Sequence, residues 1–291
     1  MQMTKYKAQA VATKYWKPGE DYLQAIIAGV EGKIADGDFV VVSEKAISTA
    51  TCNVVDENTV EPSLNARVIA RFWMRILWGR FLGPMCHFKE DMLQRLRAYP
   101  VEIGSRHKEV ALQHAGLLQA LMFGSEGGID GSNLAYSYVS LPLKNAGEKA
   151  QEICEKLWFV LRKKVCMIIA DTDKTYSFKN FHFTSRPEPI EGINSFGGVF
   201  AYVIGRMFRL ERRSTPIAVV GGKVSVEEAL EVAEVANRVR GFGAGRTVWD
   251  MADRFGTRLD EVSWEMLSTV KHKPIVIVRR KKVKKANGIV G

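Results

Sequence analysis

Apolar residues occur along the chain in two patterns, short uninterrupted runs and repeats spaced by three and four positions. The runs at 39–43 (FVVVS), 165–170 (VCMIIA) and 274–278 (PIVIV) are rich in β-branched residues, which predicts buried strands. The repeats predict amphipathic helices, and they lie at 20–30, 62–82, 89–97, 146–160 and 226–239. Because no internal repeat and no clear linker separates these segments, we expect one composite domain.

Polar residues mark where two of these helices begin. Asn145 and Ser225 are each followed three residues later by a glutamate, which predicts two capping boxes. The domain is expected to span residues 1–280. The remaining segment, 281–291, begins inside the basic run RRKKVKK, and such a tail is expected to be solvated and disordered.

The composition is that of an ordinary globular protein, with 291 residues of which 46% are apolar and 25% charged. A net charge of +10 favours anionic partners such as nucleotides, phosphorylated cofactors, RNA or an anionic membrane surface, without choosing among them. The N-terminus has no apolar signal segment, and the cysteines form no C-x-x-C pair. Both features predict a reduced, cytoplasmic protein.

The most hydrophobic stretch, residues 68–85, contains Arg71, Arg75 and Arg80, so a membrane span is not expected. Arg67, Arg71 and Arg75 fall on one stripe of the predicted helix. Two interpretations fit this stripe. The helix could be packed in a core or a dimer interface with one solvated face, or the stripe could face a polyanion.

Two aspartates stand where a metal and a phosphate could meet. Asp130 lies in the glycine-rich segment GGIDGSN, and Asp171 follows the buried run at 165–170. Glycines allow the backbone to approach a phosphate, and carboxylates are hard oxygen ligands for Mg²⁺ or Mn²⁺. Each segment alone also suits a turn or a cap without a ligand. Together they predict a metal that bridges phosphates, while the sequence contains no Walker A, G-x-G-x-x-G or H-E-x-x-H pattern.

Several segments, in order, resemble the F420-0:glutamate ligase family. GGIDGSN is similar to its AGIDASN, IIADT to its IITDT, and ANRVRGFG to its ANLLMGEG. KPGEDYL, GDFVVVSEKAIS and PIVIVR resemble further family segments, so the similarity runs through roughly residues 13 to 280. The resemblance implies an α+β fold of mixed sheets with flanking helices, in an intertwined homodimer.

The resemblance also implies an activity, in which GTP and two divalent metals join L-glutamate to a phospho-lactyl deazaflavin through an amide bond. Asp130 and Asp171 would be the catalytic carboxylates and would bind the first metal, Mg²⁺ or Mn²⁺, with Thr172 on the second. K⁺ is a further candidate cation. The nucleotide would contact a set of residues from three segments: Thr13, Lys14, Tyr15, Trp16, Asn133, Gly241 and Gly243.

The chain departs from the family pattern at four positions and by one insertion. Thr49 stands where the family has a lysine, with Lys45 nearby but out of register, and Glu44 replaces a serine. Phe242 stands where a glutamate would bind the second metal, and Thr175 where an arginine is expected. Residues 246–272 are expected to be inserted. Two alternatives therefore stay open beside the ligase, a paralogue acting on RNA or tRNA and a non-catalytic nucleotide-binding protein.

Overall fold

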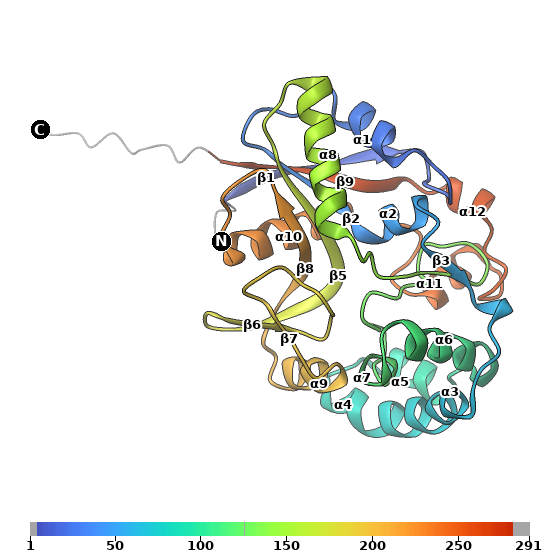
Figure 1. Ribbon diagram of the computed structural model, residues 1–291. Coiled ribbons are helices and arrows are strands. Elements are labelled where there is room, and N and C mark those ends of the chain that lie inside the picture. Colours follow the sequence, from blue (N-terminus) through green and yellow to red (C-terminus); the bar gives the residue numbers. More distant parts are fainter. Residues whose placement is uncertain (1–4, 125, 282–291) are drawn as a thin grey trace, which may run out of the picture.

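A mixed sheet of seven strands forms the centre of the computed structural model, which describes residues 5–124 and 126–281. The strand order is β1-β9-β2-β5-β6-β7, and β8 also pairs with β5, while β3 and β4 form a separate pair (Figure 1). The strands are β1 (Tyr6–Thr13), β2 (Phe39–Ser43), β3 (Val54–Asp56), β4 (Tyr138–Ser140), β5 (Cys166–Phe178), β6 (Phe181–Thr184), β7 (Asn194–Ser195), β8 (Glu211–Val220) and β9 (His272–Arg280).

Helices flank the sheet and extend one end of it. They are α1 (Tyr22–Val30), α2 (Glu44–Ala50), η1 (Glu57–Thr59), α3 (Leu64–Val68), the π-helical η2 (Ile69–Leu82), α4 (Gly83–Met85), α5 (Glu90–Arg97), α6 (Val101–His114), α7 (Leu117–Ala120), α8 (Ala146–Leu161), α9 (Val199–Met207), α10 (Val226–Arg240), α11 (Val248–Phe255) and α12 (Trp264–Ser268). This mixed arrangement confirms the expected α+β class.

The central strands are buried on both faces, because alternate side chains enter two different cores. Val40, Val42 and Ile169 pack with α1 and α8 on one face. Val41 and Ile168 pack with α10 on the other. The predicted strands at 39–43 and 274–278 are therefore confirmed, and β2 pairs in parallel with β5 and antiparallel with β9.

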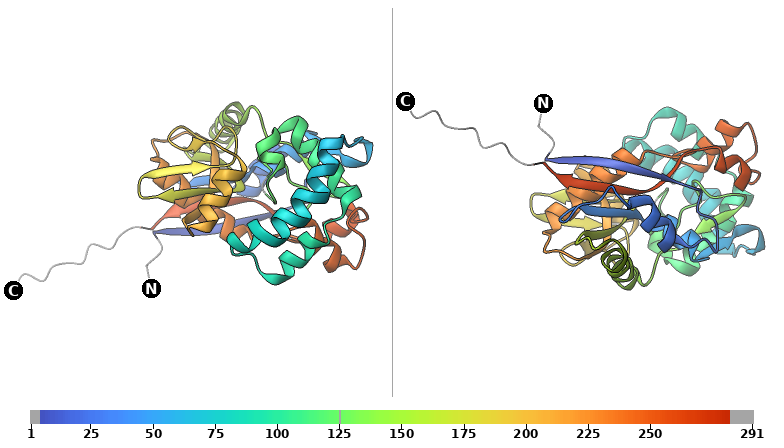
Figure 2. Two further views of the ribbon diagram at one scale, coloured as in Figure 1. Left: turned by 90° about the horizontal axis from the view of Figure 1, so that it is seen from below. Right: turned by 90° about the horizontal axis from the view of Figure 1, so that it is seen from above.

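A helical region made of α3, η2 and α4 to α7 lies opposite to where β1 begins and β9 ends (Figure 2). Its core contains Met74 and Trp78, both fully buried. Arg75 Nε donates to the carbonyl of Tyr99 at 2.8 Å, whereas Arg67 and Arg71 are exposed. The stripe is thus partly solvated, as one interpretation expected. Within the described residues, no helix is long and apolar enough to span a membrane.

Three local expectations need correction or limits. Asn145 stands at the start of α8, but its side chain makes no capping hydrogen bond. The Ser225 hydroxyl accepts from the Glu228 N–H, which is half of the predicted capping box, while the Glu228 carboxylate bonds to Tyr6 and Arg280. Asp171 lies within β5 rather than after it, because β8 continues to pair along this polar stretch. The predicted tail at 282–291 lies outside the described residues.

The pairing of β5 with β8 is irregular where the aspartates stand. Asp171 is opposite Thr215 and Lys174 is opposite Ser214, so two residues of β5 bulge out of the ladder between them. β-Bulges commonly re-aim side chains next to functional sites. Here the bulge holds Thr172 exposed between two buried aspartates, Asp171 and Asp173.

Residues 246–272 fold as a helical segment between α10 and β9. Thr247 and Asp250 form a capping box at the start of α11. Met251 and Leu267 are buried against Ala135 and Tyr15, which lie outside the segment. The segment is therefore packed onto the body of the domain rather than looped away from it.

Candidate active site

A cavity of about 1080 Å³ opens at the end of the sheet where β2 ends and β9 begins. Its walls come from the first turns of α2, the loop 129–133, the bulge of β5, the helices α5 and α6, and the segment 240–250. Asp130 and Thr172 both line it, and the buried Asp171 lies next to Thr172. The structure thus brings the two segments predicted to hold a metal to one place.

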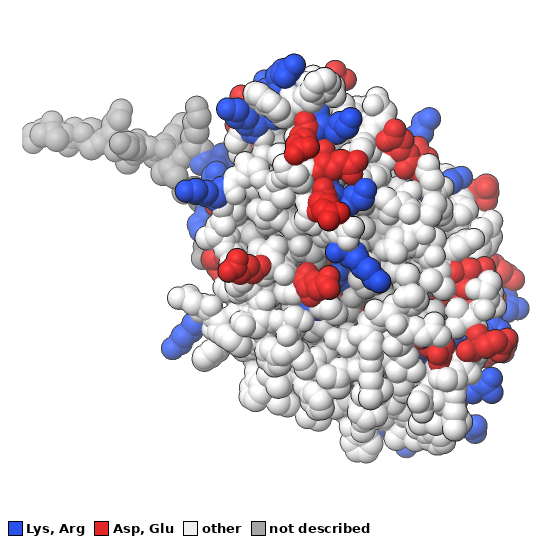
Figure 3. Space-filling model, in the orientation of Figure 1, with Lys and Arg blue, Asp and Glu red and all other residues white. Residues whose placement is uncertain are grey.

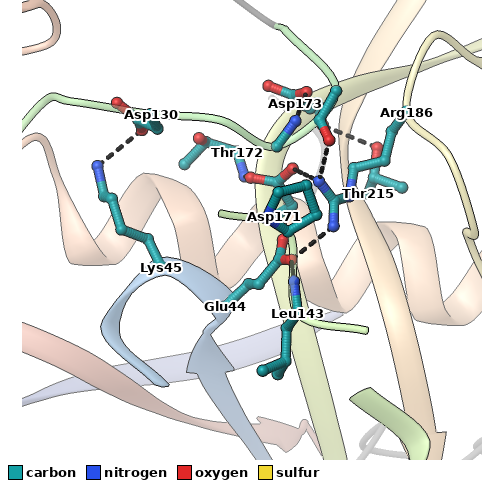
Figure 4. Close-up of polar contacts among 12 residues, drawn as sticks. Glu44, Lys45, Asp130, Leu143, Asp171, Thr172, Asp173, Arg186 and Thr215 are labelled. Carbon is teal, nitrogen blue, oxygen red and sulfur yellow. Dashed lines mark hydrogen bonds and ion pairs between the residues drawn. The ribbon is translucent and has the colours of Figure 1, made fainter. Parts of the chain in front are cut away.

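Asp130 is fixed by its backbone and by a lysine. Its N–H and C=O groups pair with those of Ser140, at 3.3 and 3.0 Å. Its Oδ1 accepts from the Ser132 N–H at 2.7 Å, and its Oδ2 accepts from Lys45 Nζ at 2.7 Å (Figure 4). Lys45 also donates to the carbonyl and the hydroxyl of Ser132. Three hydrogen bonds from one ammonium group therefore hold the loop in shape.

Arg186 connects two buried carboxylates. Its Nη2 lies 2.5 Å from Glu44 Oε1, and its Nη1 lies 3.2 Å from Asp171 Oδ2 (Figure 4). Nη1 also donates to the carbonyl of Gly127 at 2.7 Å. The guanidinium passes so close to Gly128 that a Cβ there would lie 1.4 Å from Nη1, and Gly128 has φ +97°. Only glycine fits at this position, so the glycines of GGIDGSN serve the arginine as well as the backbone.

The carboxyl groups around Arg186 outnumber it. Burial raises the pKa of Glu44 to about 8, and the charge of Asp171 adds to this while Arg186 opposes it. Burial and the charge of Asp171 also hold the pKa of Asp173 well above its usual range. Three buried carboxyl groups thus share one guanidinium. Such a cluster favours either a retained proton or an added cation.

The oxygen atoms at this edge are suited to one hard cation. Asp171 Oδ1 accepts from the Thr172 N–H at 2.6 Å. Its Oδ2 is buried and accepts no hydrogen bond within the described chain, because Arg186 approaches it without the required alignment. Among the described residues no three His, Cys, Asp or Glu side chains gather to enclose an ion. A metal held by Asp130 and Asp171 would therefore need oxygens from a bound phosphate, as Mg²⁺ commonly does.

Half of the predicted N-terminal nucleotide segment reaches the cavity. Tyr15 and Trp16 line it, whereas Thr13 and Lys14 are not among the residues of its wall. The Tyr15 ring lies 4.4 Å from the ring of His272, measured between centroids. Trp16 Nε1 and His272 Nε2 are both buried without a hydrogen-bond partner in the described part of the chain. These two nitrogens are free to recognise a ligand.

Asn133 ties the glycine loop at 241–245 to the site. Its Nδ2 donates to the carbonyls of Phe242 and Gly245, at 3.2 and 3.0 Å, and its Oδ1 accepts from the Ala244 N–H at 2.6 Å. Gly243 has φ +60°, and a Cβ there would lie 2.4 Å from Asn133 Oδ1. The structure therefore gives Asn133 a positioning role, and its predicted contact with a nucleotide stays a prediction.

The departures from the family pattern have structural counterparts. Phe242 is 54% exposed, and the Arg246 guanidinium lies 4.0 Å above its ring, which leaves an aromatic face where a carboxylate would be needed. The Thr49 hydroxyl donates to the Lys45 carbonyl, one helical turn back. Both side chains line the cavity, so Lys45 supplies a cation on the helix face where a lysine at position 49 was expected.

Four residues of this site were not predicted from sequence: Asp173, Arg186, Arg240 and His272. Asp173 was within reach of prediction, because it alternates with Asp171 along a strand. Arg186 carries no local signal, since its partner Glu44 is 142 positions away. His272 stands among five scattered histidines, and only the fold shows that it faces the cavity.

Comparison with known proteins assigns the chain to a family. The sequence model of the family described as F420-0:Gamma-glutamyl ligase matches residues 10–279. A protein of Methanocaldococcus jannaschii, described as uncharacterized, is 32% identical over 287 residues, which cover 94% of this chain and 97% of that protein. Because the match extends over nearly the whole chain, the protein belongs to the F420-0:gamma-glutamyl ligase family.

Proposed function

We propose that the protein is a nucleotide- and divalent-metal-dependent ligase that forms an amide between an activated carboxylate and an amino acid such as L-glutamate, with F420-0 as the candidate acceptor. The single observation that carries this proposal is the buried Oδ2 of Asp171, which accepts no hydrogen bond in the described chain and lies beside the cavity that Asp130 lines. The family assignment favours this function over the RNA-directed alternative. A volume of about 1080 Å³ also leaves room for a nucleotide and an acceptor together.

The proposed reaction has two steps. The terminal phosphoryl group of GTP passes to the acceptor carboxylate, which gives an acyl phosphate and GDP. The amine of glutamate then attacks the acyl carbon, loses a proton, and expels phosphate as the amide forms. When bound, a Mg²⁺ or Mn²⁺ ion would neutralise the charge of the transferred phosphoryl group.

The residues of the chain mainly position these groups. Asp130 and Asp171 would hold the metal, with the Thr172 hydroxyl as a candidate ligand of a second one. Arg186 fixes the orientation of Asp171 through its ion pair. Lys45 fixes Asp130 and keeps a positive charge beside the phosphates.

We place the nucleotide base beside Tyr15 and Trp16. Support comes from the buried Nε1 of Trp16, which has no hydrogen-bond partner in the described chain and could donate to the polar edge of a base. Trp16→Phe keeps an aromatic ring and removes the Nε1 donor. The variant is expected to bind GTP roughly 10-fold more weakly than the wild type does. The affinity for ATP, measured in the same way, serves as the comparison. Equal GTP affinity of the variant and the wild type would place the base elsewhere.

The proposal is tested by incubating the protein with GTP, Mn²⁺, L-glutamate and F420-0 and measuring the amide product by mass spectrometry. Asp171→Asn is expected to reduce the rate at least about 100-fold, since it removes a metal-binding charge. Glu155→Gln, an exposed change on α8, serves as the matched control and should leave the rate unchanged. Product formation at the wild-type rate by Asp171→Asn would contradict the proposed site.

We also propose that the protein is a homodimer. Large apolar side chains are exposed on η2, on α9 and just after α9, among them Phe72, Ile76, Phe200 and Phe208, with exposed fractions from 45% to 64%. Few charged side chains lie over α9 and α4 on the face drawn in Figure 3. Large exposed apolar side chains of this kind are typical of an interface. Sedimentation equilibrium should give twice the mass of the chain, and Phe200→Ser combined with Phe208→Ser should shift the protein toward monomer.

A further inference from the structure

Arg240, the last residue of α10, carries a guanidinium group with few partners. It lines the cavity, and its Nη2 donates to the neutral Asn237 Oδ1 at 3.0 Å. Within the described residues it forms no ion pair with a carboxylate, in contrast to Arg95 and Arg186. A guanidinium carries five N–H donors in a planar fork. Most of the hydrogen-bonding capacity of Arg240 is therefore unused.

Keeping this guanidinium charged at its position in the fold costs free energy. Burial lowers the pKa of Arg240, and the charges of Asp171 and Asp130 only partly oppose this. Arg240 is partly buried, and a partly buried cation without a paired anion is unfavourable unless a ligand supplies the opposite charge. Asp171 and Asp130, whose charges favour the charged form of Arg240, are the residues proposed to hold a metal. Arg240 thus stands next to the place where anionic groups of a substrate would arrive.

His272, the first residue of β9, provides a second unused group at the same place. Its Nε2 is buried and makes no hydrogen bond in the described chain, and the residue lines the cavity. Burial and the neighbouring charges of Lys45 and Arg240 lower the pKa of His272 to about 3, so the imidazole is neutral at physiological pH. A neutral imidazole can donate one N–H to an oxygen. Arg240 directly precedes the segment 241–271 and His272 directly follows it. Residues of this segment form part of the cavity wall.

We propose that Arg240 and His272 form an oxyanion-binding subsite that works without a metal ion. The ligand is a phosphoryl or carboxylate group, and its identity as a substrate group rests on the proposed function. The arrangement combines a planar charged fork with a neutral donor, which suits a group with several oxygens. Arg240 and Phe242 depart from the family motif ANLLMGEG, which has methionine and glutamate at the aligned positions.

The subsite is tested by titration calorimetry in the presence of EDTA, with inorganic tripolyphosphate and L-glutamate as separate ligands. The wild type should bind one of the two, which decides between a phosphoryl and a carboxylate source. Arg240→Met should weaken that binding about 10-fold or more, and Arg240→Lys should restore part of it. His272→Asn should weaken it by roughly 3- to 10-fold. Circular dichroism of each variant checks that the fold is retained.

Lys156→Met is the matched control, since it removes one positive charge from an exposed position on α8. It should change affinity by no more than about 2-fold if the effect is local rather than a matter of net charge. Binding of neither ligand by the wild type, or equal affinities of Arg240→Met and wild type, would overturn the subsite.

The outcome is separable from that of the ligase proposal. Tripolyphosphate binding that depends on Arg240, with no amide product in the Mn²⁺ assay, would retain the subsite and reject the ligase. Amide formation, together with anion binding that Arg240→Met leaves unchanged, would retain the ligase and reject the subsite.

Discussion

Lys45 Nζ lies 2.7 Å from Asp130 Oδ2, so the carboxylate proposed to hold a metal is already paired with an ammonium group. Both side chains are partly exposed, at 21% and 30%, which limits what the pair contributes to stability. A metal ion and Lys45 therefore compete for the same oxygen. An ion that binds Asp130 through this oxygen weakens the ion pair, while Lys45 stays beside the site where it can contact a phosphate.

This competition predicts the effect of Lys45→Met. The variant should bind Mn²⁺ about 2- to 5-fold more tightly in the absence of nucleotide, because no ion pair has to be broken first. Electron paramagnetic resonance of free Mn²⁺ measures the affinity, with Lys156→Met as the control for net charge. Weaker Mn²⁺ binding by Lys45→Met would show that the lysine supports the ion site through the Ser132 loop instead.

Arg186 should be the residue of the site on which folding depends most. Arg186→Met leaves Glu44 and Asp171 buried without their common partner, which is expected to cost about 3 to 5 kcal/mol of unfolding free energy. Urea denaturation measures this loss. Adding Glu44→Gln to Arg186→Met should recover part of it, since one of the buried carboxyl groups left without a partner is removed. A loss no larger than that of the exposed Arg254→Met would contradict the prediction.

His107 gives stability a pH dependence at alkaline pH. Burial opposes its charge, but the carboxylates of Glu57 and Glu126 outweigh this and raise the pKa of His107 to about 10. The raised folded-state pKa means that the stabilisation is complete below the unfolded value of about 6.5 and is lost as pH rises through about 10. His107→Asn should be less stable than wild type at pH 6.5 and should flatten this decline. Parallel curves for both proteins would refute the assignment.

His272 is expected to give stability a pH dependence of the opposite sign, with a loss at acidic pH. The pKa of His272 in the folded protein is lowered to about 3, whereas the unfolded chain binds this proton near pH 6.5. The stability contributed by the neutral ring is therefore present above about pH 6.5 and is lost as pH falls from there toward 3. Lys45 and Arg240 are the charged groups that face it, with Tyr15 and Trp16 as its ring neighbours. The NMR signal that disappears in His272→Asn should not titrate between pH 8 and 5. A midpoint near 6.5 would place the ring in solvent.

Sequence patterns predicted the framework better than the site. The β-branched runs located β2, β5 and β9, because burial on both faces requires apolar residues at every position. They could not show that β5 continues through Asp171, since the partner strand β8 and not the polarity of the stretch decides where pairing ends. Local pattern also failed at Asn145, whose side chain makes no cap.

The charged partners of the site depend on contacts between distant parts of the chain. Asp130 and Asp171 were predicted together because their motifs are similar to known ones. Lys45 was judged out of register, although a shift of four residues keeps a side chain on the same face of a helix. Arg186 and Arg240 come from other elements, and only the folded chain brings them to the cavity.

The place of β9 in the sheet has a consequence for how the protein is made. β9 lies between β1 and β2, and β1 has no other partner among the described strands. During synthesis β1 must therefore wait, with both edges unpaired, until residues 272–280 leave the ribosome. Pairing across this separation is intrinsically slow, and an unpaired strand is prone to associate with other chains. Newly made chains are thus expected to need protection longest at the strand that was synthesised first.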